Sequence, residues 1–264
     1  MTDQLHSDWK GRTRVLLGSE SMERLEKARV CIIGLGAVGG YAVEGLARSG
    51  VGCLRVVDFD AFKESNLNRQ LLALHRTMGR SKAEVAAERI RDINPDCIVE
   101  ARQEFADAAA MNALLRDMDI LVDAVDSLAP KTEIIQAGLA AGVPVYSALG
   151  AATRVDADAI RFGPLFSARG CPLGRLVRKR LRRRGVTGGD LWCVYSDEER
   201  NLDAVRDPGE EEEGEFRRGR RRALLGSLPT VTGMFGLRLA HEVILRLARG
   251  GARDNLPGDG NNNS

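Results

Sequence analysis

The sequence predicts an α/β protein whose mostly parallel sheet is doubly wound, with helices on both faces. From residue 29 to residue 150, short apolar runs rich in Val, Ile and Leu alternate with longer segments of helical periodicity. A glycine-rich turn follows the first apolar run, where a strand is expected to pass into a helix. After residue 150 the alternation becomes irregular and blocks of charge appear, which indicates a C-terminal α+β extension.

The N-terminal segment, residues 1–28, is expected to begin as a polar tail and to continue as a helix. Its apolar side chains are expected to reach the core: Leu16, Leu17, Met22 and Leu25. The first residues, MTDQLHSDWKGR, contain no apolar signal region, which favours a cytoplasmic location. The longest apolar runs are too short to span a membrane, so no membrane partner is expected.

From residue 29 onward, strands and helices are expected to alternate as in a parallel sheet with right-handed crossovers. RVCIIG at 29–34 and LRVVD at 54–58 are predicted strands on either side of a helix at 39–49. Ser81 and Glu84 form a capping-box pattern at the start of a helix over 81–92, which Asn94-Pro95 ends. The remaining expected elements are a strand at 97–101, a helical piece at 111–116, a strand at 120–125, a helix at 131–141 and a strand at 143–148.

The second part of the chain is expected to contain a strand at 159–162, an amphipathic helix at 173–184 and a closing helix at 231–249. Residues 198–222 combine four consecutive glutamates with the run RRGRRR, which is typical of a mobile loop. The final residues, 251–264, are expected to be disordered. We therefore divide the chain into a helical segment (1–28), a core (29–150), an extension (151–250) and a tail (251–264).

The cysteines and the overall charge set further bounds on the protein. The chain has 264 residues and five cysteines, and no two cysteines form a C-x-x-C pair. This pattern favours reduced thiols and predicts no structural zinc. The formal net charge of +2 is close to neutral, but it conceals strongly charged local blocks.

The glycine-rich turn predicts a nucleotide site. Gly34, Gly36 and Gly39 form the pattern G-x-G-x-x-G between a predicted strand and a predicted helix. The first glycine permits a tight turn, the second lets the backbone approach a phosphate, and the third lets helix and strand pack closely. Asp58 ends the next strand, where an acidic residue would bind ribose hydroxyls on a Rossmann-like fold. The alternative is a turn whose glycines serve packing alone.

The stretch VVDFDAFKESNLNRQ, residues 56–70, and the lysine that follows it favour a triphosphate over a dinucleotide. Arg69 and Lys82 are cations that a hydride carrier does not need. Lys82 lies in the first turn of a predicted helix, where the helix dipole disfavours a cation by up to about 1 kcal/mol. A triphosphate would explain this cation. The alternatives are a solvated lysine and, for the whole site, an NAD-dependent dehydrogenase, although nothing here looks like a hydride-transfer site.

Asp126 is the candidate metal ligand. It follows the fourth predicted strand, in DAVDS, and the carboxyl ends of parallel strands face the ligand. An acidic side chain at this position is expected to hold Mg²⁺ that bridges phosphate oxygens. The alternative is a role in an Asx turn or as a helix N-cap, which the nearby Pro130 favours.

These residues together resemble the motifs of the ThiF/MoeB/HesA superfamily of ubiquitin-activating-like adenylating enzymes, over about residues 12–150. The most specific element is N-x-N-R-Q, which here is Asn66-x-Asn68-Arg69-Gln70. The superfamily binds MgATP and adenylates a carboxylate. The resemblance implies a role for each matching residue: Asp58 holds ribose, Asn68, Arg69 and Gln70 lie at the phosphates with Asn66 in the same site, Asp60 shapes the site, Lys82 neutralises the triphosphate and Asp126 holds the metal. It also implies a homodimer in which Arg12, in GRTRVLLG, acts in the partner's site.

Within the superfamily, the chain is similar to the tRNA threonylcarbamoyladenosine dehydratase branch. The similarity lies in residues 68–95, in DAVDSLAPK at 123–131 and in the arginine-rich CPLGRLVRKRLRRRG at 171–185. This branch adenylates the carboxylate of a modified tRNA base and then closes a ring. Some members have a cysteine before the last helix, but LLGSLPTVTG at 224–233 has none. Any nucleophilic cysteine would therefore be Cys171, for which a structural thiol is the alternative.

The helix predicted at 173–184 contains seven cations and no acid, and its leucines lie on one face. We expect it to bind tRNA phosphates, through Arg178, Arg182, Arg183 and Arg184. The alternative is a basic surface paired with the glutamates at 210–213. Two other functions stay open: activation of a small ubiquitin-like carrier protein, which would involve a sulfur-transfer partner, and nucleotide binding without catalysis.

Overall fold

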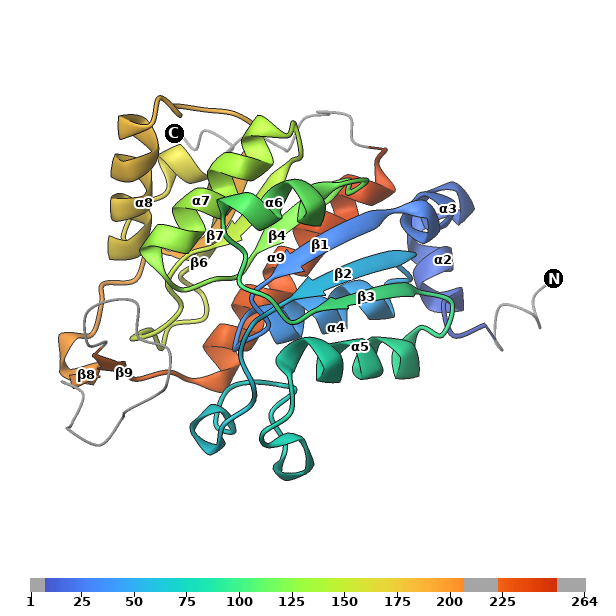
Figure 1. Ribbon diagram of the computed structural model, residues 1–264, viewed down its shortest axis with the longest axis horizontal. Coiled ribbons are helices and arrows are strands. Elements are labelled where there is room, and N and C mark those ends of the chain that lie inside the picture. The colour runs from blue at the N-terminus through green and yellow to red at the C-terminus, as the bar shows by residue number, and fades with distance from the viewer. Residues whose placement is uncertain (1–7, 207–222, 251–264) are drawn as a thin grey trace, which may run out of the picture.

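A computed structural model describes residues 8–206 and 223–250, and it contains one large sheet with helices on both faces (Figure 1). The strands of this sheet are β1 (Arg29–Ile33), β2 (Cys53–Val57), β3 (Ile98–Arg102), β4 (Ile120–Asp123), β5 (Val145–Ala148), β6 (Ile160–Pro164) and β7 (Leu191–Ser196). Their order is β3-β2-β1-β4-β5-β7-β6, and all neighbours are parallel except β6 and β7. The predicted α/β fold is confirmed.

The helices form two layers. They are α2 (Gly11–Leu17), α3 (Ser19–Lys27), α4 (Gly39–Arg48), α5 (Lys82–Ile93), α6 (Ala108–Leu115), α7 (Leu128–Ala140), α8 (Pro172–Arg183) and α9 (Pro229–Ala248). Helices α3, α4, α5 and α9 lie together on one side of the sheet, and α6, α7 and α8 lie together on the other (Figure 1). The described residues also form four short 3₁₀ turns, η1 (Glu64–Asn66), η2 (His75–Thr77), η3 (Leu165–Ser167) and η4 (Leu202–Ala204), and a two-stranded ribbon of β8 (Val205–Arg206) and β9 (Leu224–Leu225).

The central strands β1, β2, β4 and β5 are buried on both faces, and this explains their nearly continuous apolar sequences. Successive side chains of a strand point to opposite faces, so Val30 and Ile32 of β1 belong to the core under α4 and α9. Cys31 and Ile33 belong to the second core, under α6 and α7. The two cores fix the register, since a one-residue shift would exchange them.

Helix α9 packs closely on α4 through a glycine. A Cβ atom at Gly236 would lie 2.3 Å from the carbonyl oxygen of Val38, so only glycine permits this approach. Helix α9 thereby covers the sheet from the α4 side and also contacts β5 and β7. The C-terminal part of the chain is thus built into the same sheet and the same core as residues 29–150.

The structure differs from the predicted elements in several places. We did not predict β7, although its sequence, LWCVYS, is apolar. Helix α7 begins at Leu128 rather than 131, because Pro130 lies in its first turn, where a missing N–H is tolerated. The predicted N-terminal helix is divided into α2 and α3 at Gly18, whose φ is 86°. The prediction that Leu16 reaches the core is wrong, since it is 82% exposed, whereas Met22 and Leu25 are fully buried and Leu17 packs against the core.

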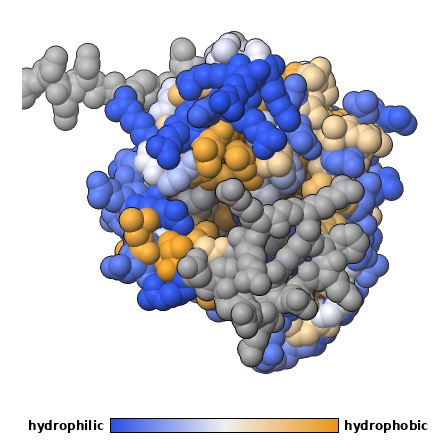
Figure 2. Space-filling model, turned by 60° about the vertical axis from the view of Figure 1, so that its left-hand side comes forward, coloured by the Kyte–Doolittle hydropathy of each residue, from blue (hydrophilic) through white to orange (hydrophobic). Residues whose placement is uncertain are grey.

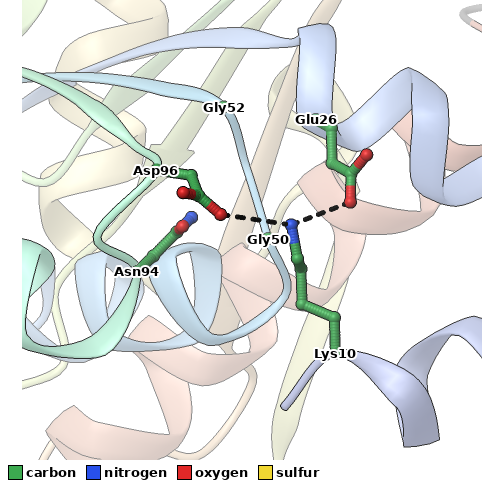
Figure 3. A pocket seen from close by; sticks show the side chains of 6 residues that line it. All are labelled: Lys10, Glu26, Gly50, Gly52, Asn94 and Asp96. Atoms are coloured by element: carbon green, nitrogen blue, oxygen red, sulfur yellow. Dashed lines mark ion pairs between the residues drawn. The ribbon is translucent and has the colours of Figure 1, made fainter. Parts of the chain in front are cut away.

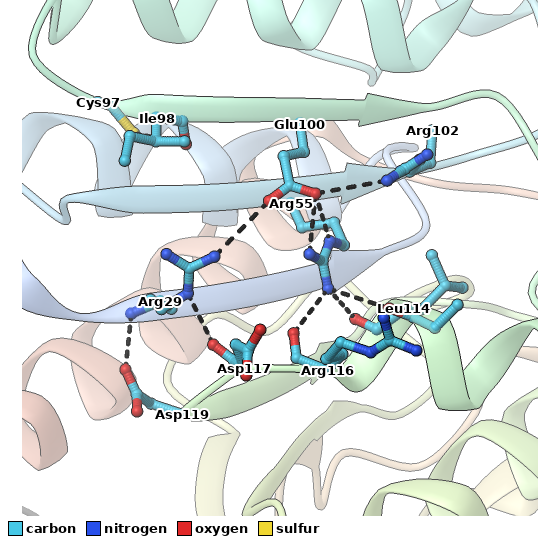
Figure 4. A network of polar contacts seen from close by, with 11 residues as sticks. Arg29, Arg55, Cys97, Ile98, Glu100, Arg102, Leu114, Arg116, Asp117 and Asp119 are labelled. Carbon is cyan, nitrogen blue, oxygen red and sulfur yellow. Dashed lines mark hydrogen bonds and ion pairs between the residues drawn. The ribbon is translucent and has the colours of Figure 1, made fainter.

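A polar network joins the edge strand β3 to the rest of the sheet (Figure 4). Arg55 of β2 is almost fully buried, and its guanidinium donates to the carbonyl oxygens of Leu114 and Arg116 at 2.8 and 3.1 Å. It also donates to Glu100 of β3 at 2.9 Å. Carbonyl groups at the end of a helix lack partners within that helix. Arg55 therefore caps α6 and holds β3 with one side chain.

A small pocket lies at the end of the sheet where β1, β2 and β3 begin, which we call the amino edge (Figure 3). It has a volume of about 200 Å³ and is lined by Lys10, Glu26, Gly50, Gly52, Asn94 and Asp96. The ammonium group of Lys10 lies 2.8 Å from the carboxylate of Glu26 and 4.0 Å from that of Asp96. This ion pair anchors the start of α2 to α3 at the amino edge of the sheet.

Each of the five cysteines is a buried free thiol, as predicted. In the part of the chain that the structure describes, no helix is both long and apolar enough to cross a membrane. We predicted a mobile loop over residues 198–222, but residues 198–206 are described and contain η4 and β8. The rest of that predicted loop, residues 207–222, and the tail 251–264, which we predicted to be disordered, lie outside the described residues.

Candidate nucleotide site at the carboxyl edge of the sheet

The glycine-rich turn lies between β1 and α4. Its three glycines are needed for different reasons. A Cβ atom at Gly34 would lie 2.9 Å from the backbone of Ala124, and one at Gly39 would lie 1.8 Å from the carbonyl oxygen of Gly34. Packing therefore requires both. A Cβ atom at Gly36 would meet only the side chain of Gln70, at 3.7 Å. The space beside Gly36 is open, as the approach of a ligand would require.

Asp58 follows β2 and is connected to the glycine-rich turn. Its two carboxylate oxygens accept hydrogen bonds from the N–H groups of Leu35 at 2.7 Å and Asp60 at 2.9 Å. Burial raises the pKa of Asp58, while nearby Lys82 and the two N–H groups act in the opposite direction. The carboxylate thus fixes the turn and the loop after β2 in one arrangement, with unused lone pairs for a further donor.

Lys82 is the first residue of α5, after the N-cap Ser81, and its side chain is buried. Its ammonium group lies 3.2 Å from the carboxylate of Asp60, which is about half exposed. This ion pair offsets the unfavourable helix dipole, and the sequence interpretation did not include it. The structure therefore brings Asp58, Asp60 and Lys82 together at the carboxyl edge.

The N-x-N-R-Q element begins with Asn66, the last residue of η1, and its Gln70 lies beside the glycine-rich turn. The side chain of Asn66 accepts from the N–H of Lys63 at 3.1 Å, so it closes η1. Arg69 donates to the carbonyl oxygen of Ser65 at 2.9 Å and to the side chain of Asn68 at 2.8 Å. Gln70 is buried near Gly36, and its Oε1 atom has no hydrogen-bond partner in the structure. A buried amide oxygen without a partner is costly, so a ligand or water is expected there.

Asp126 lies between β4 and α7, at the same edge of the sheet, and is exposed. It accepts a hydrogen bond from the hydroxyl of Ser127 at 3.2 Å, and Ser127, not Asp126, is the N-cap residue of α7. Within residues 8–206 and 223–250, no group of three or more His, Cys, Asp and Glu side chains could hold a metal. In nucleotide sites Mg²⁺ usually binds one or two carboxylates and completes its shell with phosphate oxygens and water.

Two of the predicted site residues lie elsewhere. Arg12 is exposed on α2, at the amino edge, so it is distant from the glycine-rich turn of its own chain (Figure 1). Cys171 is buried, and its sulfur accepts from the N–H groups of Gly150 and Gly174, both at 3.4 Å. As the N-cap of α8, Cys171 has a structural role that accounts for it.

Helix α8 presents its cations along the surface, but several of them have protein partners. Arg178 is partly buried, with a long contact of 3.5 Å to the carbonyl oxygen of Leu165, and Arg182 lies over the ring of Phe166. Arg184 donates to Gln136 of α7 at 3.0 Å. Three further cations of α8 are exposed: Arg175, Lys179 and Arg183. Figure 2 shows a band of hydrophilic side chains across the top of the face that carries α8.

The sequence interpretation missed a buried polar cluster directly beneath the site. Asp123, Lys131 and Ser147 are all fully buried, and their side chains are within hydrogen-bond distance of one another. Asp123 and Lys131 flank Asp126 in the same segment, DAVDSLAPK. A lysine and an aspartate eight residues apart give no sign in sequence that both are buried.

The fold and these positions define a class of protein: a Rossmann-like α/β protein with a glycine-rich turn, an acidic strand end and a buried lysine at one edge of its sheet. Within this class the chain belongs to the ThiF family, whose model matches residues 11–258. The predicted family is confirmed.

Individual relatives agree with this assignment. A tRNA threonylcarbamoyladenosine dehydratase of Bacillus subtilis is 34% identical over 188 residues, which are 71% of this chain and 74% of that protein. A molybdopterin-synthase adenylyltransferase of Escherichia coli is 36% identical over 137 residues, 52% of this chain and 54% of that one. The crystal structure of Escherichia coli tRNA N6-threonylcarbamoyladenosine dehydratase in complex with ATP has a TM-score of 0.81 at 29% identity, and it covers 93% of this chain and 96% of that chain.

Proposed function

We propose that this chain is an ATP-dependent adenylating enzyme that converts threonylcarbamoyladenosine in tRNA to its cyclic, dehydrated form. The observation that carries the proposal is the open space beside Gly36, which the side-chain amide of Gln70 borders through its Nε2 atom and which lies on the same edge as buried Lys82. A triphosphate would lie against the turn and near the lysine. The dehydratase relatives at 34% identity and the neighbouring structure with bound ATP support this choice of nucleotide and substrate.

The proposed chemistry is electrostatic and positional. ATP and the substrate carboxylate are both anionic, and Lys82, Arg69 and Arg12 would offset this repulsion. Asp60 pairs with Lys82, and Ser65 and Asn68 accept hydrogen bonds from Arg69, so these partners would share both cations with the phosphates. Mg²⁺ held by Asp126 would polarise the phosphate oxygens and favour the departure of pyrophosphate.

The reaction would proceed in two steps. A carboxylate oxygen of the substrate attacks the α-phosphorus of ATP, and pyrophosphate leaves, which gives an acyl-adenylate. The carbamoyl group of the same modified base then attacks the activated carbonyl carbon, the ring closes and AMP leaves. Both reacting groups belong to one substrate, so proximity supplies much of the second step and no enzyme nucleophile is required. The buried, capping Cys171 is consistent with this scheme.

We also propose a homodimer in which Arg12 acts in the partner's site. Arg12, Val15 and Leu16 lie on one face of α2 by helical spacing, and both apolar residues are largely exposed. A second copy of the chain would cover this apolar face. A two-fold axis would then supply two equivalent arginines. Since all five cysteines are free thiols, we place this enzyme in the cytoplasm.

The direct test is the exchange of labelled pyrophosphate into ATP by the purified protein. Exchange is expected with tRNA that carries threonylcarbamoyladenosine, and it is expected to disappear with unmodified tRNA or after removal of divalent cations with EDTA. Tight NAD binding without any ATP signal in calorimetry would contradict the adenylation proposal. Exchange that depends on a small carrier protein instead of tRNA would favour the second candidate function.

That second candidate is activation of a carrier protein's C-terminal carboxylate. The observation in its favour is the similarity to the molybdopterin-synthase adenylyltransferase over half of the chain. The same nucleotide site would serve it, because both substrates present a carboxylate. The absence of C-x-x-C pairs from the sequence and the basic helix α8 favour the tRNA substrate.

A tRNA substrate makes a prediction about α8. Cys171 at its start contacts Gly150 beyond β5, and Arg184 at its end contacts the middle of α7, so α8 runs from the site edge toward the amino edge. A tRNA stem lying on α8 would bring its loop to the nucleotide. Replacing Arg175, Lys179 and Arg183 with Gln is expected to reduce the slope of log affinity against log salt by about 2–3, without any change in ATP affinity.

The matched control replaces three exposed cations on the opposite side of the sheet: Lys27, Arg91 and Arg249. This control variant has the same net charge as the α8 variant, and its salt dependence is expected to equal that of the wild type. Filter binding or fluorescence anisotropy at several salt concentrations measures both. Equal slopes for all three proteins would show that α8 does not contact tRNA.

A further inference from the structure

The buried cluster of Asp123, Lys131 and Ser147 lies beneath the candidate nucleotide site. The ammonium group of Lys131 donates to Asp123 Oδ2 at 2.6 Å and to Ser147 Oγ at 3.1 Å. The hydroxyl of Ser147 donates to the same Asp123 oxygen at 2.7 Å. All three side chains have no exposed surface. A buried ion pair is often no more stabilising than apolar side chains of the same volume, so its presence here calls for another reason.

The cluster joins the three elements that surround the segment 124–127. Asp123 is the last residue of β4, Lys131 is in the first turns of α7, and Ser147 is in β5. The second oxygen of Asp123 accepts from the N–H of Val125 at 3.1 Å, within the segment itself. Removing Lys131 would leave a buried carboxylate without its cation and release the start of α7 from β4.

The segment 124–127 in turn supports the nucleotide site. The N–H of Ala124 donates to the carbonyl oxygen of Ile33 at 2.9 Å, just before the glycine-rich turn. A Cβ atom at Gly34 would lie only 2.9 Å from the backbone of Ala124. The Cβ atom of Ala124 lies 3.3 Å from the position that a Cβ atom of Gly39 would take. Asp126, the candidate metal ligand, is two residues further along. The glycine-rich turn and Asp126 therefore both depend on the position of the segment 124–127.

We propose that Lys131 is a positioning residue for the nucleotide site. It has no exposed atom, so it does not touch the nucleotide. It acts through Asp123, which holds the 124–127 segment against the glycine-rich turn and directs Asp126 toward the phosphates. The effect on ATP rests on the function proposed above, whereas the effect on the segment does not.

The test compares two variants, Lys131→Met and the double variant Asp123→Asn/Lys131→Met. The single variant leaves a buried carboxylate unpaired, so it is expected to melt at a clearly lower temperature than the wild type. In the double variant an uncharged amide faces Ser147, and most of the melting temperature is expected to return. Both variants lack the ion pair between Lys131 and Asp123 that joins α7 to β4. Both are therefore expected to bind MgATP at least about tenfold more weakly, and to exchange the amide hydrogens of residues 124–127 and 34–39 faster.

A control separates positioning from general loss of stability. Arg55→Met removes another buried cation, which holds α6 and β3 rather than the nucleotide site. Faster exchange is then expected near the end of α6, with unchanged exchange at 124–127. Wild-type exchange at 124–127 and 34–39 in the double variant would overturn the proposal. Hydrogen exchange needs no nucleotide, so a wild-type protein that failed to bind ATP would overturn only the proposed function.

Discussion

Gly36→Ala is expected to weaken MgATP binding by about 10- to 100-fold and to leave the fold intact. Its Cβ atom would meet only Gln70 at 3.7 Å, an ordinary van der Waals contact, and Gly36 does not have a positive φ. The new methyl group would occupy the space that we assign to phosphate. One hydrogen bond to a charged group contributes about 1.5–3 kcal/mol, and 1.4 kcal/mol corresponds to a factor of ten.

Substitutions of two other glycines provide comparisons for this experiment. Gly163 in β6 has no neighbour within 4 Å of its Cβ position, so Gly163→Ala is a matched control with unchanged ATP affinity and melting temperature. Gly39→Ala would place a methyl group 1.8 Å from a carbonyl oxygen, and it is expected to lower the melting temperature strongly. Calorimetric titration and thermal melting measure these properties. If Gly36→Ala binds MgATP as the wild type does, the nucleotide does not lie against the turn.

Mixing Arg12→Ala with Lys82→Ala is expected to restore activity that neither variant has alone. In the proposed dimer, each site combines Lys82 of one chain with Arg12 of the partner subunit. A mixed dimer then contains one intact site and one doubly defective site. Random exchange of equal amounts makes half of the dimers mixed, so about a quarter of wild-type activity is expected.

The measurement is AMP release after the two variants have been unfolded and refolded together. The same variants refolded separately and then combined briefly provide the control, because they cannot exchange subunits. Arg12 belongs to α2, which lies at the opposite end of the strands from the glycine-rich turn (Figure 1). Absence of any recovery would mean that Arg12 is dispensable or that the chain acts as a monomer.

The sequence predicted the strands β1, β2, β4 and β5 because each is a short apolar run that is buried on two faces. It also predicted the edge strand β3, which is largely exposed. The prediction was less accurate for elements whose position depends on tertiary contacts. Strand β7 pairs with β5 only after a long connection through β6 and α8, and its apolar residues did not follow the regular alternation. Leu16 has the helical spacing of a core residue, but its helix packs at the edge of the sheet and exposes it. A single sequence does not distinguish a core face from an interface.

The candidate site was predictable where a motif fixes the backbone, and less so where side chains meet. The G-x-G-x-x-G turn and Asp58 lie together because they follow adjacent parallel strands. The pairing of Lys82 with Asp60 and the engagement of Arg69 by Ser65 depend on the path of the loop after β2, which no pattern in the sequence specifies. Asp123, Lys131 and Ser147 come from three elements, and only the fold reveals that they meet.

The two outer strands of the sheet bear on how the protein avoids aggregation. Edge strand β3 has five residues and carries Glu100 and Arg102, and Arg55 holds Glu100 in place. Edge strand β6 is equally short and ends in Pro164. Short length, charge and proline are the features that prevent an open edge from templating fibril-like growth. Both edges of the sheet therefore have features that disfavour edge-to-edge association of newly made copies of the chain.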